Sequence, residues 1–193
     1  MPTEVKGALD LRKALKKFTP DLAKETQKEL GSLLKPITQK ARGFIPSEAP
    51  LSGWGKASIN GRFPEWSSQA AKRGIGYKTT PSRPNRSGFR ALARIVNNSA
   101  AGAIFETAGR VNPNGRSDSK SKNPGAGNMF IEAIDQYGMI VDAGRKTGDG
   151  KSRKMKGRAI FKAWYEDGGK TNAAVLKAIA AAKVKFDAAV GRR

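Results

Sequence analysis

The chain has 193 residues, with 37 lysines and arginines against 16 aspartates and glutamates, and a formal net charge of +21. A surface of this sign is attracted to polyanions such as nucleic acid, acidic protein surfaces and anionic lipid. The sequence contains no histidine and no cysteine, which excludes an imidazole general base, a thiolate nucleophile and the usual ligands of zinc. We therefore predict a binding or structural protein, not an enzyme, with no metal and no cofactor.

The same composition bears on where the protein is made. No apolar run approaches the roughly 20 residues that span a bilayer, and the first residues lack the apolar segment of a signal peptide. The absence of cysteine fits a reducing cytoplasm. We expect a soluble protein made in the cytoplasm, without a membrane partner.

Apolar residues at helical spacing predict two helices within the first 44 residues. Leu11, Leu15, Phe18 and Leu22 fall on one face at 3.6 residues per turn. The run Thr19-Pro20-Asp21 then carries the signals of a helix start: an N-cap, a proline in the first turn and an acid.

We accordingly expect a short helix over about 7–18 and a longer one over about 20–42, in which Pro36 should produce a kink. The apolar stripe of the longer helix comprises Leu30, Leu33, Leu34, Ile37 and Ala41.

Residues 46–68 have the composition of a loop, rich in glycine and proline, and carry three aromatic rings: Trp54, Phe63 and Trp66. Two tryptophans are rarely left in water. We expect them to attach the loop to the core or to a neighbouring subunit, ahead of a role in stacking on bases.

The centre of the chain predicts a small antiparallel sheet. A strand over 75–79 is followed by a turn-rich stretch over 81–88 and a second strand over 89–97. The segment Ala103–Glu106 is compatible with either a short strand or a helical turn.

Two long polar stretches follow, over about 110–127 and 144–158, separated by an apolar segment that contains Phe130. The second stretch is a candidate for phosphate contacts or, equally, a solvated loop that contacts acidic side chains of a neighbour. Its cations are Arg145, Lys146, Lys151, Arg153, Lys154, Lys156 and Arg158.

The end of the chain predicts helices over 159–167 and 171–190, the second alanine-rich and capped by Thr171 or Asn172. The predicted fold class is α+β: N-terminal amphipathic helices packed on a small antiparallel sheet, long polar loops and a C-terminal alanine-rich helix. We expect a single domain over residues 1–193.

Motifs of catalysis are weak. Neither Gly74-Ile75-Gly76 nor Gly125-Ala126-Gly127 extends to a dinucleotide fingerprint, and the acids show no metal-ligand spacing. A magnesium-dependent nuclease is the least favoured hypothesis, kept because its chemistry requires neither histidine nor cysteine.

The order of several segments resembles a known family. A helix ends in Ala41-Arg42-Gly43-Phe44-Ile45-Pro46 and leads to Ser52-Gly53. The segments Ile104-Phe105-Glu106-Thr107-Ala108-Gly109 and Asn128-Met129-Phe130-Ile131-Glu132-Ala133 come later. This order is similar to that of the neck and tail-completion (head–tail joining) proteins of long-tailed bacteriophages, typified by a gene-ten product.

The match covers most of residues 8–135 with short motifs. In the family the first of these later segments ends in Gly-Thr, here rearranged to Thr107-Ala108-Gly109, and the second has two prolines that are missing here.

The resemblance implies a virion structural protein that forms a ring, expected to be a hexamer, between the head connector and the tail. Its partners would be further copies of itself, the head connector or stopper, and the tail terminator or tail-tube protein, with transiting DNA as a further candidate. It would lie in the neck or tail of the virion and have no catalytic activity.

In that setting we predict two kinds of contact residue. The interface anchors are Trp54, Phe63, Trp66, Phe105 and Phe130, and the contacts to polyanions or acidic rings are the cations of 144–158. The alternative from another class is a non-specific nucleic-acid-binding protein. A tail terminator or stopper ring is less favoured than tail completion.

Overall fold

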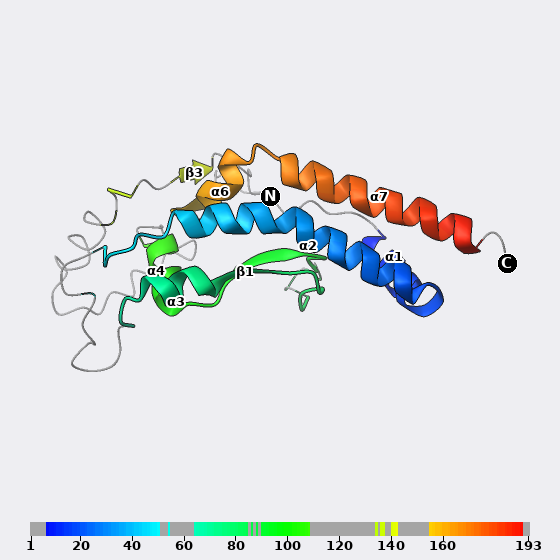
Figure 1. Cartoon of the computed structure of the whole chain (residues 1–193), viewed down its shortest axis with the longest axis horizontal. Helices are drawn as coiled ribbons and strands as arrows, with labels where there is room; N and C mark the ends of the chain where they lie inside the picture. Colours follow the sequence, from blue (N-terminus) through cyan, green and yellow to red (C-terminus); the bar gives the residue numbers. More distant parts are fainter. Residues whose placement is uncertain are drawn as a thin grey trace. The chain divides into compact units, whose positions relative to one another are not determined.

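The computed structural model describes residues 7–50, 54, 64–84, 86, 88, 90–108, 134, 136–137, 140–142 and 155–190 (Figure 1). The chain forms two compact units. Unit 1 comprises Met1–Gln39, Tyr77–Val96 and Asp167–Arg193, and unit 2 comprises Lys40–Gly76 and Asn97–Glu166. Because both units combine segments that are distant in sequence, the chain passes between them several times.

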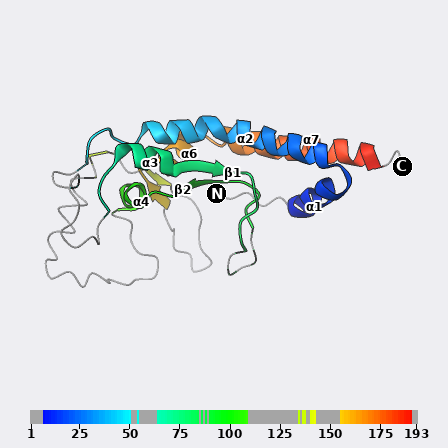
Figure 2. The same ribbon diagram turned by 60° about the horizontal axis from the view of Figure 1, so that its bottom comes forward.

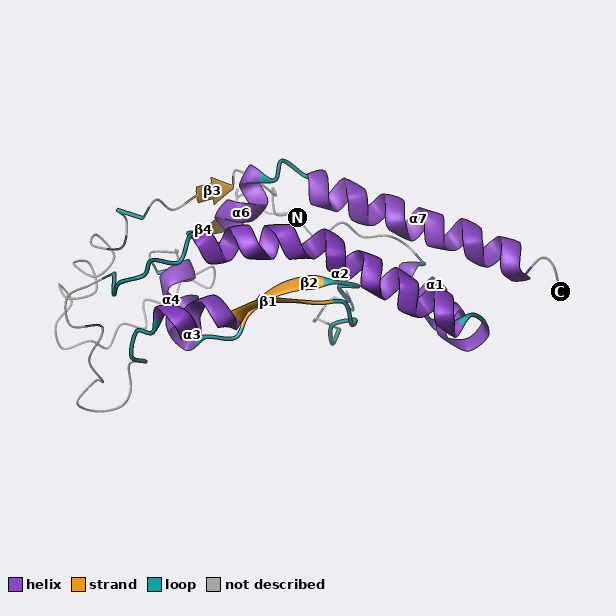
Figure 3. Ribbon diagram, viewed as in Figure 1, coloured by secondary structure: helices purple, strands orange, loops and turns teal. Residues whose placement is uncertain are grey.

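Three helices build most of unit 1: α1 (Ala8–Phe18), α2 (Pro20–Gly43), which continues into unit 2 after Gln39, and α7 (Lys170–Val190). Figure 3 shows α2 and α7 as the two longest helices. One buried cluster joins Leu30 and Ile179 to Ala8, and a second joins Leu15 and Ala23 to Ala182. The part of the predicted apolar stripes that lies in these clusters therefore packs with α7: Leu11, Leu15, Leu22, Leu30 and Leu33.

A β-hairpin is formed by β1 (Ile75–Lys78) and β2 (Arg94–Asn97), which pair with each other. Beyond the strands, the amide of Ser82 donates to the carbonyl of Ala91 at 2.9 Å, and the amide of Ala91 donates to the hydroxyl of Ser82 at 2.9 Å. These paired bonds hold the two arms of the hairpin together past the end of the ladder.

The hairpin also packs on the helices of unit 1. Leu92 contacts the cluster around Leu30, and the ring of Tyr77 lies over Gly31, where an added Cβ would come within 3.3 Å of it. The structure is thus α+β, with N-terminal helices packed on a small antiparallel sheet, as the sequence predicts.

Unit 2 contains shorter elements. They are α3 (Ser68–Gly74), α4 (Ala100–Thr107), β3 (Ile140–Asp142), β4 (Met155–Gly157) and α6 (Ile160–Glu166). Strands β3 and β4 are antiparallel, with Val141 opposite Lys156. At the edge of this unit, the guanidinium of Arg42 donates twice to the carbonyl of Ile75, at 2.9 and 2.7 Å.

Several local predictions are confirmed and others are corrected. The predicted helices and the first strand lie where expected, but the second strand is restricted to Arg94–Asn97. Ala103–Glu106 belongs to the helix α4, whose first turn is capped by Ser99 accepting from the amide of Gly102 at 3.2 Å.

Thr19 directly precedes α2, and its carbonyl accepts from the amide of Ala23 at 3.1 Å, as predicted for the N-cap position, whereas its hydroxyl donates back to the carbonyl of Leu15. The predicted cap at Thr171 is wrong. Thr171 lies inside α7 and donates to the carboxylate of Asp167, from its amide at 2.7 Å and from its hydroxyl at 2.8 Å. Asp167 therefore provides the cap of α7, because a carboxylate is a stronger acceptor than a hydroxyl.

Candidate interaction surfaces

An aromatic cluster occupies the interior of unit 2. The ring centroids of Trp54 and Trp66 are 4.9 Å apart, those of Trp66 and Phe105 5.7 Å, and those of Phe105 and Tyr137 5.5 Å. Such tilted and edge-on arrangements at 4.5–7 Å are those that aromatic pairs prefer. The cluster brings α4 together with segments that precede and follow it by more than 25 residues.

The cluster corrects part of the prediction of interface anchors. Trp54, Trp66 and Phe105 are 4%, 7% and 0% exposed, so the folded chain presents none of these rings to a neighbour. Trp54 and Trp66 thus pack into the core, as the sequence predicts for one of their two possible attachments. Phe63 and Phe130 lie outside the described residues.

The two tryptophans differ in how their indole N–H groups are satisfied. Nε1 of Trp54 donates to the carbonyl of Pro64 at 2.9 Å, and the amide of Trp66 donates to the carbonyl of Trp54 at 2.9 Å. Nε1 of Trp66 is buried and has no acceptor among the residues that the structure describes. A buried donor without a partner costs free energy, so the two rings should not contribute equally to stability.

Glu106, on α4, is a buried carboxylate with a defined role. It is 4% exposed and accepts three backbone amides at the start of α6: Ala159 at 2.6 Å, Ile160 at 3.1 Å and Phe161 at 3.0 Å. The first amides of a helix have no intrahelical acceptor, and a negative charge at this end also interacts favourably with the helix dipole. Glu106 therefore satisfies the first turn of α6.

Glu106, on α4, binds the start of α6, and Arg158, which precedes α6, binds the end of α4. Its Nη1 donates to the carbonyls of Phe105 at 3.0 Å and Ala108 at 2.7 Å, which belong to the C-terminal end of α4. We call Glu106 and Arg158, with the helix ends that they bind, the α4–α6 clasp. Gly157 lies beside it, where any Cβ would collide with the carboxylate of Glu106.

The clasp corrects one predicted polyanion contact. Arg158 is 1% exposed, so its charge serves the interior of unit 2 and not a phosphate or an acidic ring. Lys156 lies in β4, and of this residue only the backbone is described. The other five cations of this stretch lie outside the described residues, so their role as polyanion contacts stays a prediction: Arg145, Lys146, Lys151, Arg153 and Lys154.

Sequence reasoning did not find the clasp, although a signal existed. Glu106 is the only acid in the apolar run Ala100–Thr107, and such an isolated acid is a candidate for a buried structural partner. The partner could not be named from sequence, because the bonded residues are 53 positions apart.

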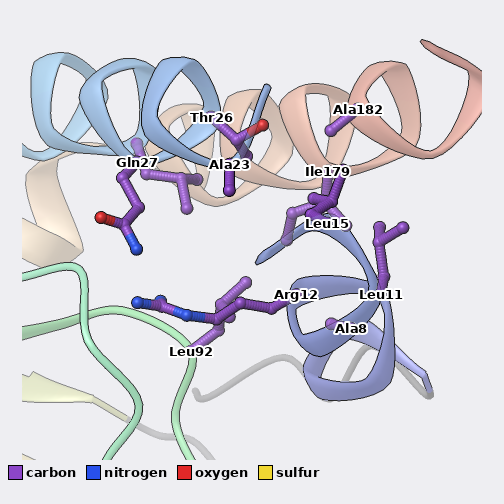
Figure 4. A pocket seen from close by; sticks show the side chains of 11 residues that line it. Ala8, Leu11, Arg12, Leu15, Ala23, Thr26, Gln27, Leu92, Ile179 and Ala182 are labelled. Carbon is purple, nitrogen blue, oxygen red and sulfur yellow. The ribbon is translucent and has the colours of Figure 1, made fainter. Parts of the chain in front are cut away.

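A small cavity lies in unit 1 between α1, α2, α7 and Leu92 (Figure 4). Its lining is apolar except for Arg12, Thr26 and Gln27, and its volume is about 30 Å³. A cavity of this volume has room for water.

Arg12, at the edge of this cavity, donates from Nη1 to the carbonyl of Thr79 in the hairpin. Partial burial lowers the pKa of Arg12 from its ordinary value, but an arginine remains charged at neutral pH. This hydrogen bond connects α1 to the hairpin just after the end of β1.

Surface lysines on the helices of unit 1 are partly neutralised by acids. Nζ of Lys13 lies 3.5 Å from Oδ1 of Asp10, and Nζ of Lys24 lies 3.5 Å from Oδ1 of Asp21. Nζ of Lys185 is 2.8 Å from the carboxylate of Glu25, and this hydrogen bond, together with the charge of Glu25, raises the pKa of Lys185.

The described part of the chain offers no group of three or more acidic, histidine or cysteine side chains that could hold a metal ion. In the same residues, no helix is long and apolar enough to cross a membrane. Comparison with family models, with curated proteins and with solved structures finds no match to this chain.

Proposed function

We propose that the protein is a structural subunit of the neck of a long-tailed bacteriophage, forming a ring that joins the head connector to the tail or completes the tail end. The proposal rests on the family resemblance of the sequence and on the high positive charge, which suits contacts with acidic neighbouring rings.

One observation supports it above the others. Phe105 and Glu106, the central residues of the first family-like segment, are both buried: Phe105 packs in the aromatic cluster, and Glu106 holds α6. In this chain these two motif residues therefore organise the fold, which is the role expected of a motif in a structural protein.

Oligomer formation is the first test. Mass photometry of the purified protein, alone and with the tail tubes of its virion, should detect a ring of defined size, expected to be a hexamer, because closed rings have a fixed number of subunits. A protein that stays monomeric under both conditions would contradict the proposal.

Electron microscopy of particles assembled without the gene provides the second test. We expect filled heads and separate tails. Intact virions produced without the protein would rule out a joining or completing role.

The alternative, a non-specific nucleic-acid-binding protein, is favoured by the net charge alone. It predicts tight DNA binding by the monomer with a steep salt dependence, and no ring on tail tubes.

A further inference from the structure

The β-hairpin of unit 1 carries charge of a single sign. Its segment Tyr77–Val96 contains five cations and no acid, whereas the helices of the same unit contain acids as well as lysines. The five cations are Lys78, Arg83, Arg86, Arg90 and Arg94.

Most of these side chains are accessible, and none has an ion-pair partner among the described residues. Lys78, Arg83, Arg86 and Arg90 are exposed, and Arg94, which is half-buried, donates to the carbonyl of Thr80 at 3.2 Å. None of the five forms an ion pair with another described residue, in contrast to Lys13, Lys24 and Lys185 on the helices. Their charge is thus available to an external anion.

The type of cation also changes between the helices and the hairpin. Four of the five hairpin cations are arginines, whereas every exposed cation of unit 1 in α1, α2 and α7 is a lysine. A guanidinium presents a planar fork of donors that matches two phosphate oxygens, while an ammonium acts as a point charge. The hairpin is therefore suited to phosphate in a way that the helices are not.

The backbone that carries these arginines is held at its base. The reciprocal bonds of Ser82 and Ala91 join its two arms, Leu92 packs in the core, and Arg12 binds the carbonyl of Thr79. Figure 2 shows the loop of the hairpin extending away from α2 and α7. These contacts fix the backbone at the positions next to Arg83 and Arg90, which lowers the backbone entropy that those positions lose on binding.

We propose that this hairpin binds the phosphate backbone of duplex DNA, through Arg83, Arg86 and Arg90 at its exposed end and Lys78 beside them. A two-stranded ribbon is narrow enough to enter the major groove, but the contacts that we infer are to phosphates and carry no sequence preference. The inference rests on the proposed function and extends it by naming DNA as a partner of the ring, and it adds the hairpin as a polyanion contact to the cations predicted over 144–158.

Fluorescence anisotropy with a short duplex of random sequence, at several salt concentrations, tests the proposal. The test variant is Arg83→Gln/Arg86→Gln/Arg90→Gln. The matched control is Lys28→Gln/Lys35→Gln/Lys177→Gln, which removes the same charge from exposed helix positions of unit 1. All six side chains are exposed, so both variants should fold, and circular dichroism verifies this.

Each lost phosphate contact lowers the slope of log K against log salt by about 0.9, so the hairpin variant should lose about 2.7 in slope. Between about 50 and 200 mM salt, the wild-type affinity should therefore fall about 40-fold more than that of the variant. The control variant should change the slope by less than about 1.

Equal losses in both variants, or no binding by the wild type at low salt, would overturn the proposal. So would displacement of the DNA by polyglutamate as readily as by unlabelled duplex, which would indicate an acidic-protein site. Mass photometry of the same samples separates this inference from the proposed function. Rings that do not bind DNA contradict only the hairpin site, and DNA binding by a protein that never forms rings contradicts only the neck role.

Discussion

Replacing Glu106 by glutamine should destabilise unit 2 while leaving the helices of unit 1 folded. The carboxylate accepts three amides with its two oxygens, two on Oε2 and one on Oε1. A glutamine has one oxygen, and its NH₂ group would face at least one of these N–H groups without being able to accept from it.

The expected loss follows from these contacts. A hydrogen bond to a charged group contributes about 1.5–3 kcal/mol, and a buried donor left without an acceptor costs about 1–3 kcal/mol. Because glutamine still accepts part of the set, we expect a decrease of about 2–4 kcal/mol in the free energy of unfolding. With a urea dependence on the order of 2 kcal/mol per molar, the midpoint should fall by about 1–2 M.

The distribution of tryptophans makes the two units separately observable. Trp54, Trp66 and Trp164 all belong to unit 2, so tryptophan fluorescence reports its unfolding. Far-ultraviolet circular dichroism is dominated by α1, α2 and α7, with 11, 24 and 21 residues. We expect the Glu106→Gln variant to shift the fluorescence transition much more than the dichroism transition.

The matched control is Glu48→Gln, which removes the same charge from an exposed position of unit 2. A surface change of this kind should alter stability by less than about 0.5 kcal/mol. If Glu106→Gln shifted the fluorescence midpoint no more than Glu48→Gln, the clasp would not stabilise unit 2 and our account of Glu106 would be refuted.

Two further predictions follow from single contacts. Trp54→Phe should lower the free energy of unfolding by about 1–2 kcal/mol more than Trp66→Phe. Only the first change removes a hydrogen bond, the one to Pro64, whereas the second removes a buried N–H that has no acceptor among the described residues. Equal losses of stability in the two variants, measured by fluorescence, would contradict this. Glu25 raises the pKa of Lys185, so the stabilisation from this pair is fully present below the ordinary lysine pKa and is lost as the pH rises through the raised value. An NMR titration should give a lower pKa for Lys185 in Glu25→Gln than in the wild type, and an unchanged pKa would show that the contact does not persist in solution.

The parts of the fold that follow from local pattern were predictable. The buried side chains of α2 include Leu30, Leu34, Ile37 and Ala41, which are four of the five residues assigned to its apolar stripe. Short apolar runs were less informative. Ala103–Glu106 could be a strand or a helical turn by composition, and the cap at Ser99, together with the burial of Phe105, places it in a helix.

The candidate contact surfaces were predicted less well, because charge and aromaticity alone do not indicate exposure. The sequence groups Arg158 with the cations of its basic stretch, but the residue is buried; it places Arg83 and Arg86 in a turn and Arg90 in a strand, and all three are exposed. The distinction depends on whether a partner lies within reach in the fold. Arg158 donates to a carbonyl at the C-terminal end of α4. The hairpin arginines have no acid near them in sequence, and none of them takes part in an ion pair among the described residues.

The sequence by itself determined the net charge, the lack of imidazole and thiol chemistry, the α+β class and the positions of the long helices. These properties depend on composition and on spacing within a few turns of the chain. Only the tertiary structure decided which rings and charges leave the surface. Burial of Trp66, Phe105, Glu106 and Arg158 depends on partners far away in sequence, and the cost of desolvating a charge is met only where those partners supply the hydrogen bonds.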